Sequence, residues 1–362
     1  GHRWIEDKGG IESVNRILEN DYLQDFITMR NNFGRICNDL DNKLRYADDT
    51  QQKTADDLMN LQMQQEKYRK YLETTEKIIS WLENNSKRSD IKKNLITCYH
   101  DPEFYKRINT NPNIFVCKNG VLDLEKLEFR PGVPDDMMML HSEMTYITPE
   151  EIDNDHYHFN KNIELHEYLE KFVIDDELRQ YVLEYFALSL DGGKKPNKLA
   201  IFFGRGSNGK TCFMDNLISR VFGDYYMKAD AGNLTRKRPD PNSPQPATAA
   251  LRGKRIVICE EPDAHGSLAV GFVKELTGGG NLTARELHKP PVTFPIQFQI
   301  GLLCNDKPDI PSPDYGTLRR LLPIPMTTQY VRSGDKQYYK VLNPAKYPNY
   351  FHGTDDIDEQ LT

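Results

Sequence analysis

The sequence predicts an α/β fold with a central parallel sheet, preceded by a mainly helical N-terminal region. Residues 1–100 contain few glycines and prolines and have helical periodicity. From residue 199, apolar segments alternate with helix-compatible ones, and the first apolar segment leads into a glycine-rich loop. We therefore expect four regions. They are a helical region at 1–110, a small mixed domain at 111–193, the α/β core at 194–332, and a tail or the start of a further segment at 333–362.

Composition bounds the class of protein. The chain has 362 residues, of which 38% are hydrophobic and 28% charged, so it can bury cores of ordinary size. No run of 18 apolar residues occurs, and we expect no membrane span. None of the six cysteines sits in a CxxC pair, which predicts reduced thiols and no zinc site.

A long amphipathic helix is expected in the N-terminal region. Eight positions there follow one another in steps of three and four, and six of them are apolar. They are Leu58, Leu61, Gln65, Tyr68, Leu72, Thr75, Ile79 and Leu82. The pattern predicts a helix that packs on its neighbours, with a coiled-coil or collar contact between subunits as the alternative.

The next region changes from helix to short strands and back. The segment NPNIFVCKNGVLDLEKLEFRPG indicates strand, turn, strand and turn, with Asn119-Gly120 as the hairpin signal. Residues 163–190 return to helical spacing, and DGGKKPNK at 191–198 ends that helical stretch. We place the core strands at Leu199–Phe203, Arg255–Cys259 and Phe298–Cys304, and we find no motif in the tail from Val331.

The strongest motif follows the first core strand. The residues from Gly204 to Thr211 match GxxxxGK[ST], between an apolar strand and a helix-compatible segment. Glycines let backbone N–H groups converge on a phosphate, and the helix N-terminus adds partial positive charge. Lys210 is expected at the β- and γ-phosphates and Thr211 at Mg²⁺. The nucleotide-binding residues are Gly204, Arg205, Gly206, Ser207, Asn208, Gly209, Lys210, Thr211 and Cys212.

Polar residues follow the next two core strands. Glu260 and Glu261 come directly after an apolar strand, where an open α/β sheet binds ligands. We expect Glu260 to hold the metal and Glu261 to polarise the attacking water. Asn305 follows the third strand and is expected to contact the γ-phosphate or this water. An exposed acidic pair and an ordinary turn asparagine are the structural alternatives.

Charge is unevenly distributed. Residues 194–332 carry 20 Lys and Arg against 12 Asp and Glu, a net +8, and the rest of the chain carries −15. Two clusters contribute, Arg236-Lys237-Arg238 and the group of Arg252, Lys254 and Arg255. Solvated surface is the favoured interpretation of both clusters, and contact with DNA is the alternative.

These motifs agree in order and spacing with a known family. The phosphate loop, the Glu-Glu strand, FVKELTGGGNLTARELHK and the strand ending in Asn305 resemble a superfamily 3 helicase of the AAA+ class. The resemblance covers residues 105–330 and extends to LRGKRIVICEEP and GTLRRLLPIPM. It is closest to the primase-helicases of poxviruses and other nucleocytoplasmic large DNA viruses. Relatives often have an acid after the two glycines of a TGGD stretch, where this chain has Gly280-Asn281.

The resemblance implies further site residues. The family's DNA-contacting hairpin maps to His288 and Lys289, with Lys274 and Arg285 as supporting basic residues. For these last two, simple ion pairing is the alternative. The arginine finger that completes a neighbouring subunit's site maps to Arg319, with Arg320 as the alternate.

The resemblance also implies an activity. It implies an ATP- and Mg²⁺-dependent DNA helicase that forms a homo-hexamer on single-stranded DNA and replication forks. It implies other viral replication proteins as partners, no membrane, and action at a viral replication site in the host cytoplasm. Two alternatives remain open, a P-loop kinase and an ATP-gated replication-initiation scaffold without unwinding activity.

Overall fold

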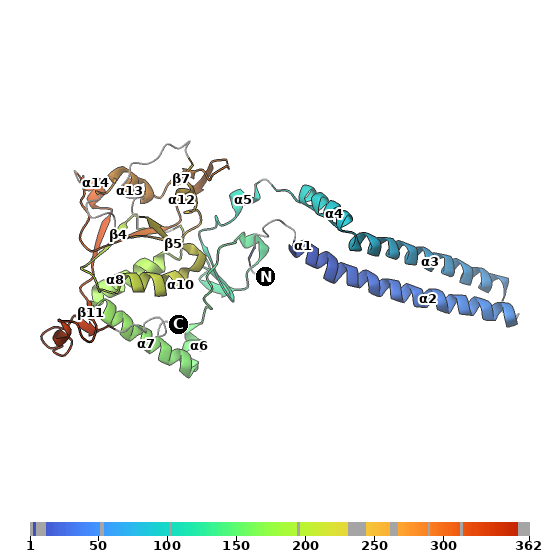
Figure 1. The fold of residues 1–362 in the computed structure, drawn as a ribbon, viewed down its shortest axis with the longest axis horizontal. Helices are drawn as coiled ribbons and strands as arrows, with labels where there is room; N and C mark the ends of the chain where they lie inside the picture. The colour runs from blue at the N-terminus through green and yellow to red at the C-terminus, as the bar shows by residue number, and fades with distance from the viewer. Residues whose placement is uncertain are drawn as a thin grey trace. The chain divides into compact units, whose positions relative to one another are not determined.

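The computed structural model divides the chain into two compact units, Ile5–Phe104 and a second one made of Gly1–Trp4 with Tyr105–Thr362. Figure 1 shows both. The structure describes residues 3–4, 12–50, 54–101, 103–193, 196–230, 244–260, 267–288, 290–311 and 314–353. The regions expected at 111–193, 194–332 and 333–362 all fall within the second unit. Their boundaries stay predictions.

The first unit is helical, as expected. It contains α1 (Glu12–Arg16), a π-helical turn (Ile17–Tyr22), α2 (Leu23–Thr50), α3 (Ala55–Glu83) and α4 (Asn85–Cys98). The Thr54 side chain caps α3 by accepting from the Asp57 amide.

The eight periodic positions predicted between Leu58 and Leu82 are all buried or half-buried on α3. They pack on α2, where Phe33 contacts the rings of Tyr68 and Tyr71 at centroid distances of 6.2 and 5.6 Å. The helix prediction and its inward face are thus confirmed.

The second unit begins with short elements and a small sheet. They are α5 (Phe104–Arg107), β1 (Ile114–Cys117), β2 (Gly120–Asp123), β3 (Glu128–Arg130) and a 3-10 turn (Pro134–Asp136). The strands β1, β2 and β3 pair antiparallel in that order. This confirms the first predicted strand and the turn before Gly120, but the predicted second strand is divided into β2 and β3 by a turn at 124–127. Three helices follow: α6 (Pro149–Asn154), α7 (His156–Phe172) and α8 (Asp176–Leu188).

A five-stranded parallel sheet forms the centre of this unit, in the order β10-β4-β9-β6-β5. Its strands are β4 (Leu199–Phe203), β5 (Tyr226–Asp230), β6 (Ile256–Glu260), β9 (Gln299–Cys304) and β10 (Leu321–Pro325). The three strands predicted from the sequence are β4, β6 and β9, each within one residue of its expected bounds. The predicted α/β class, with a helical region before a central parallel sheet, is confirmed.

Short elements connect and follow these strands. After β4 come α9 (Lys210–Cys212), a π-helical segment (Phe213–Ile218), α10 (Ser219–Phe222) and a 3-10 turn (Gly223–Tyr225). Further along lie α12 (Pro246–Ala249), α13 (Val270–Leu276), β7 (Asn281–Ala284), β8 (Val292–Pro295) and α14 (Tyr315–Leu318). The tail contains β11 (Gln329–Val331), a 3-10 turn (Tyr338–Lys340) and β12 (Tyr350–His352), with β11 and β12 parallel.

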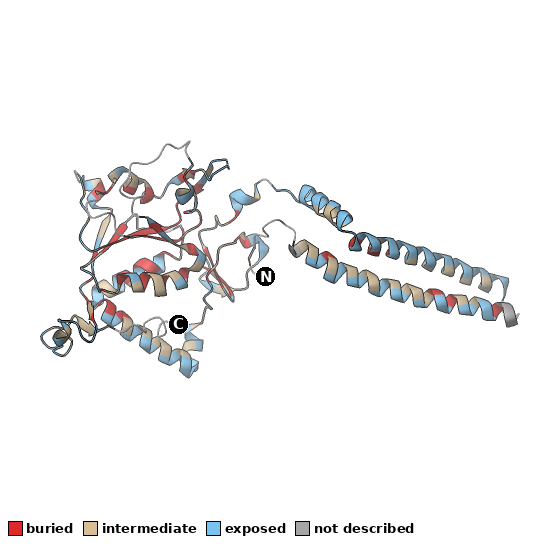
Figure 2. Cartoon of the chain, viewed as in Figure 1, coloured by how far each residue is buried: buried red, intermediate tan, exposed pale blue. Residues whose placement is uncertain are grey.

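The three inner strands β4, β6 and β9 are buried on both faces and are mainly red in Figure 2. Ala200 and Phe202 of β4 point into a cluster with Phe186 of α8 and Phe213, on the side of α8 and α10. Leu199 and Ile201 point into the opposite cluster, on the side of α12 and α13. Because successive strand residues face opposite sides, a strand covered on both faces must be apolar throughout.

The small sheet shares a core with the parallel sheet. Phe115 of β1 stacks on Tyr225 at 4.6 Å between ring centroids. The Tyr225 hydroxyl donates to the Leu140 carbonyl at 2.8 Å and accepts from the Val116 amide at 3.2 Å. Burial raises the pKa of Tyr225, so its hydroxyl stays protonated as a donor.

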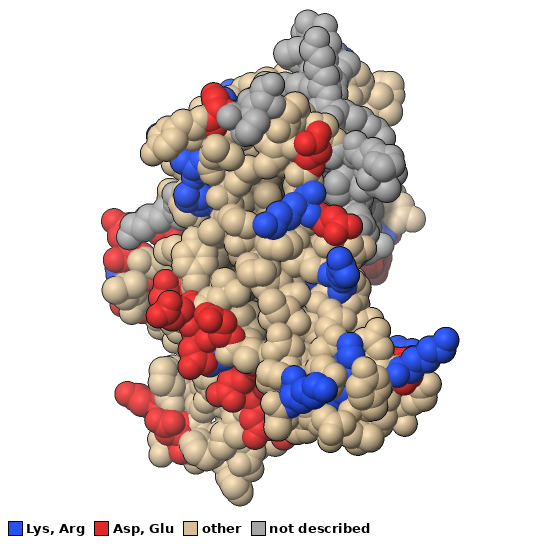
Figure 3. Space-filling view, turned by 90° about the vertical axis from the view of Figure 1, so that its left-hand side faces the viewer, with Lys and Arg blue, Asp and Glu red and all other residues tan. Residues whose placement is uncertain are grey.

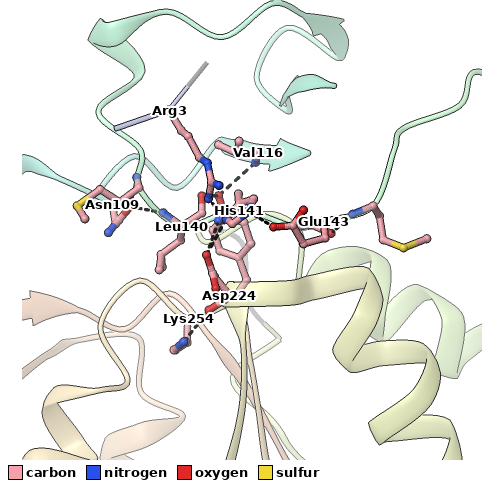
Figure 4. Close-up of polar contacts among 12 residues, drawn as sticks. Arg3, Asn109, Val116, Leu140, His141, Glu143, Asp224 and Lys254 are labelled. Atoms are coloured by element: carbon pink, nitrogen blue, oxygen red, sulfur yellow. Dashed lines mark hydrogen bonds and ion pairs between the residues drawn. The ribbon is translucent and has the colours of Figure 1, made fainter. Parts of the chain in front are cut away.

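Charged and polar side chains add further contacts beside this shared core (Figure 4). The His141 ring contacts Asp224 through Nδ1 at 2.7 Å and Glu143 through Nε2 at 2.5 Å. Arg3 also contacts Nδ1 of this ring. Lys254 donates to the Asp224 carbonyl at 2.6 Å. These contacts therefore join the segment around residues 137–144 to the 3-10 turn at Gly223–Tyr225.

The basic cluster of Arg252, Lys254 and Arg255 is part of this junction, which corrects the sequence interpretation for Arg255. Arg255 is fully buried, so it is neither a solvated surface residue nor a DNA contact. Its guanidinium donates to the carbonyls of Asn111 and Ile114, and Arg252 donates to the carbonyl of Ile108. Burial lowers the pKa of both guanidinium groups.

Replacing Tyr225 tests this joint core. Tyr225→Phe keeps the ring but leaves the Leu140 carbonyl and the Val116 amide without their buried partner. We expect the free energy of unfolding to fall by about 1–3 kcal/mol, measured by urea denaturation. Tyr226→Phe is the matched control, since that hydroxyl has a 3.4 Å contact with Asp215, and it should cost less. Equal losses in the two variants would contradict the assigned role of Tyr225.

Candidate functional site

The glycine-rich loop connects β4 to α9. Ser207 and Gly209 both have positive φ, at 59° and 74°. This left-handed backbone alternates with ordinary conformations, the pattern by which successive N–H groups form an anion-binding nest. Gly204 has no room for a side chain, because a Cβ there would lie 2.4 Å from the Met326 carbonyl oxygen. A Cβ at Gly206 would meet nothing within 4 Å, so the loop is open at that point.

The segment that follows β10 supports the loop through hydrogen bonds. Asn208 is 2% exposed and donates from Nδ2 to the carbonyls of Met326 at 2.9 Å and Thr328 at 2.5 Å. The Tyr330 amide donates to the Ser207 carbonyl at 2.8 Å. Thr328 is itself fastened to the end of α7, where its hydroxyl donates to the Lys171 carbonyl at 2.8 Å. These hydrogen bonds therefore support the shape of the loop.

Lys210 extends into this loop. Its side chain is mostly buried, at 8% relative exposure, and Nζ donates to the Gly204 carbonyl and to Asn208 Oδ1, the latter at 3.3 Å. Thr211 and Cys212 complete the first turn of the helix, at its positive end.

A cavity of ≈ 440 Å³ lies over the loop. Its lining comes from the loop, the first helical turn, the ends of β6 and β9 and the middle of β5. The lining residues are Gly206, Ser207, Asn208, Gly209, Lys210, Thr211, Cys212, Lys228, Glu260, Leu303, Cys304 and Asn305.

The strand register explains why distant residues meet at this cavity. Phe203 of β4 pairs with Cys304 of β9, and Leu303 pairs with Glu260 of β6. The three strands therefore end at the same edge, with the loop, Asn305 and Glu260 at their carboxyl ends. Glu261 lies outside the described residues.

The residues lining the cavity fit a magnesium nucleotide. Thr211 and Glu260 offer a hydroxyl and a carboxylate, the hard oxygen donors that Mg²⁺ takes. A cation already stands beside Glu260, because Lys228 Nζ lies 2.6 Å from its Oε1. The loop nest, Lys210 and the helix end supply the positive potential that phosphates need. When bound, such a metal would supply charge neutralisation for the phosphate oxygens.

Sequence reasoning missed Lys228 and the buried support by Asn208 and Thr328. Lys228 lies on β5, a half-exposed edge strand without a recognisable motif. Asn208 was assigned to the loop, but its bond to Thr328 joins residues 120 positions apart. No local pattern reports such a contact.

The two arginines lie at the other end of the sheet. Arg320 directly precedes β10, and its carbonyl accepts from the amide of Leu199, the first residue of β4. Its Nη1 donates to the Gly316 carbonyl at 2.8 Å, whereas Arg319 is exposed. Both therefore stand at the amino edge of β4, opposite the edge that carries the loop.

The expected hairpin is formed by β7 and β8, which pair antiparallel from Asn281–Pro295 to Ala284–Val292. His288 is exposed in the connection between them, with φ 60°, and Lys289 lies outside the described residues. Gly279 precedes β7 with φ 73°, a conformation that favours glycine.

The two supporting basic residues are placed differently. Lys274 pairs with Asp314 at 2.7 Å, which is the ion-pairing alternative. Lys274 and Thr317 lower the pKa of Asp314. Arg285 is half-buried after β7, and its carbonyl accepts from the Gln245 amide.

On the face drawn in Figure 3, the charges of the described residues do not single out a nucleic-acid surface. In the view of Figure 3, Lys and Arg side chains are interspersed with Asp and Glu over the residues drawn in colour, and the acidic side chains gather on one side. The cluster Arg236-Lys237-Arg238 lies outside the described residues. No helix of the described part of the chain is long and apolar enough to cross a membrane.

Comparisons with known proteins give the family context. Residues 1–175 match the family described as D5 N terminal like, and residues 202–320 match a family of unknown function, DUF5906. A protein of Acanthamoeba polyphaga mimivirus named "putative helicase" is 35% identical over 285 residues, which are 79% of this chain and 29% of that protein. A "putative helicase" of Invertebrate iridescent virus 6 is 29% identical over 234 residues, 63% of this chain and 24% of that protein.

More distant matches extend the set. A "putative primase" of African swine fever virus is 24% identical over 298 residues, 82% of this chain and 29% of that protein. A solved apo structure of the NrS-1 C terminal region has a TM-score of 0.37 and 15% identity, covering 61% of this chain and 48% of that one. The chain spans less than a third of the length of each of these three viral relatives. By sequence, the chain is a homologue of proteins named helicases and primases in large DNA viruses, and it carries a D5 N terminal like region.

Proposed function

We propose that this chain is the motor region of an ATP-dependent DNA helicase for viral genome replication, of the AAA+ superfamily 3 type. The observation that carries the proposal is the cavity at the carboxyl edge of the sheet. The supported phosphate loop with Lys210, the carboxylate of Glu260 and the amide of Asn305 all line it. The motor would assemble as a hexameric ring that translocates on single-stranded DNA.

Each residue then has a role in hydrolysing ATP. Lys210 binds the β- and γ-phosphates, and Thr211 and Glu260 hold Mg²⁺. Glu261 orients and deprotonates the attacking water, and Asn305 donates to the γ-phosphate or to this water. The nest formed by the loop around Ser207 and Gly209 binds phosphate oxygens through backbone N–H groups.

The position of Arg319 and Arg320 supports a site shared between subunits. β4 has five residues, so about 17 Å of strand separates its amino end from the loop. Neither arginine is placed to serve the cavity of its own chain, because each begins at the opposite edge. Arg319 is exposed there and free of the Gly316 contact that holds Arg320. In a ring, Arg319 would neutralise charge on the neighbour's γ-phosphate, with Arg320 as the alternate.

Contact with DNA is assigned to the hairpin of β7 and β8. His288 is exposed between the two strands, as a residue that follows a phosphate backbone must be. Lys289 would supply the charge that contacts phosphate, and Arg285, the first residue after β7, would support the connection between the two strands. Lys274 would act indirectly, since its partner Asp314 begins the helix that leads to Arg319.

ATP hydrolysis with and without single-stranded DNA tests the proposed function. The chain should hydrolyse ATP faster with DNA, and Lys210→Ala should abolish ATP binding, measured with a fluorescent ATP analogue. Lys161→Ala, on the exposed face of α7, is the control and should bind normally. Turnover unchanged by DNA, with no ring in light scattering, would favour a kinase instead.

Glu261→Gln separates the motor from an assembly scaffold. The motor should keep ATP binding and lose unwinding, because the base that activates water is gone. A scaffold that uses ATP only to assemble would keep its function in this variant.

Mixing experiments test the shared site. Arg319→Ala should bind ATP with less than a threefold change in affinity and lose hydrolysis by about 10³-fold. Mixing it with Glu261→Gln subunits should restore some activity, because some interfaces then combine an intact arginine with an intact glutamate. Arg220→Ala, an exposed arginine on α10, is the control. Normal hydrolysis by Arg319→Ala would show that the finger is assigned to the wrong residue.

The hairpin has its own test. Lys289→Ala should reduce DNA-stimulated turnover and lower the slope of log affinity against log salt by about 1, because one phosphate contact is lost. Basal turnover without DNA should be retained. Lys336→Ala, an exposed lysine of the tail, should keep the wild-type slope. Intact unwinding by Lys289→Ala would remove the hairpin from the mechanism.

A further inference from the structure

Lys228 forms ion pairs with two carboxylates at the candidate site, Glu260 and Asp215. It lies on β5, where it pairs in register with Ile258 of β6, and its side chain lines the cavity. Its Nζ is 2.6 Å from Glu260 Oε1 and 2.9 Å from Asp215 Oδ2. Asp215 lies four residues after Thr211, one turn further along the helix that follows the loop. One ammonium group thus bridges Glu260, which lines the cavity, and Asp215 on the helix that follows the loop.

The charges of this bridge set a constraint on metal binding. Asp215, Glu260 and Lys228 together carry a formal charge of −1, and without Lys228 they would carry −2. Glu260 is also the carboxylate assigned to Mg²⁺, so Lys228 stands where a second cation is needed. An ammonium group and a metal ion compete for the same carboxylate oxygens, because each gains from the same negative charge.

We propose that Lys228 is a positioning residue, a resident cation that holds Glu260 before the metal nucleotide binds and shifts to Asp215 when the metal arrives. The identity of the ligand rests on the proposed function. The geometry supports the exchange, because the flexible lysine stem already reaches both carboxylates. The departing ammonium therefore keeps one acceptor, so release of Glu260 does not leave an unpaired charge.

The exposure of the three groups sets the size of the effect. Lys228 is 41% exposed, Glu260 38% and Asp215 35%, so water screens their attraction. Hydrogen bonds to Glu260 and Asp215 raise the pKa of Lys228, which keeps it charged. We expect its removal to change metal affinity about three- to fivefold, the range for a screened ion pair.

Metal binding to the intact chain tests the exchange without measuring turnover. Mn²⁺ is the probe, since it takes the same oxygen ligands as Mg²⁺ and its free ion is counted by electron paramagnetic resonance. The measurement is made with Mn²⁺ alone and with Mn²⁺ plus ADP. Lys228→Met should bind Mn²⁺ about three- to fivefold more tightly. Lys228→Arg keeps the charge and should bind no more tightly than wild type.

Asp215→Asn should change the Mn²⁺ affinity in the opposite direction. Without its second acceptor, Lys228 stays on Glu260, and Mn²⁺ affinity should fall below that of wild type. Lys161→Met is the matched control, since it removes an exposed ion pair with Glu164 on α7 and should leave the affinity unchanged.

The outcomes separate this inference from the proposed function. Wild-type ADP binding with unchanged or weaker Mn²⁺ affinity in Lys228→Met overturns the role of Lys228 and leaves the nucleotide site intact. Tighter Mn²⁺ binding by Lys228→Met in a chain that never binds nucleotide supports the resident cation and overturns the proposed function. Equal effects of Lys228→Met and Asp215→Asn overturn the exchange between the two carboxylates.

Discussion

Burial of β4 on both faces is the constraint on which the rest of the second unit depends. Ala200 and Phe202 require cover on one side of the sheet, and Leu199 and Ile201 require it on the other. The helices on each side meet this need, and β9 and β10 complete its hydrogen bonds. Packing on both faces fixes the position of the carboxyl end of β4, and therefore the position at which the loop after Phe203 begins. The residues that line the cavity take their positions from this packing.

Sequence reasoning succeeded for segments whose structure is determined by one local property of the sequence. The strands β4, β6 and β9 are apolar throughout because both their faces are covered, and they were located within one residue. The inward face of α3 was predicted in full because helical periodicity alone determines it. The glycine-rich loop after β4 was picked out as the strongest motif because each of its residue types has a separate physical reason.

Sequence reasoning failed for residues whose position depends on contacts with residues distant along the chain. β5 and β10 lie at the edges of the sheet, so they are half-exposed, and β10 contains two prolines that an edge strand tolerates. Neither reads as a core strand. Arg255 was assigned to the surface because arginine is mostly exposed, yet carbonyl oxygens of Asn111 and Ile114 bind its guanidinium in the interior. Lys228 gained its significance from two carboxylates that the sequence places 13 positions before it and 32 positions after it.

The bonds from Asn208 to Met326 and Thr328 have a consequence for synthesis of the protein. They join the loop to residues that the ribosome adds 118 and 120 positions later. Until those residues have emerged from the ribosome, the loop lacks these hydrogen bonds, and the candidate site is incomplete. Domains fold during synthesis at about 5–20 residues per second, so this interval lasts on the order of 6–24 seconds. For the proposed ATP ligand, a complete site would form only after the last strand of the parallel sheet is in place.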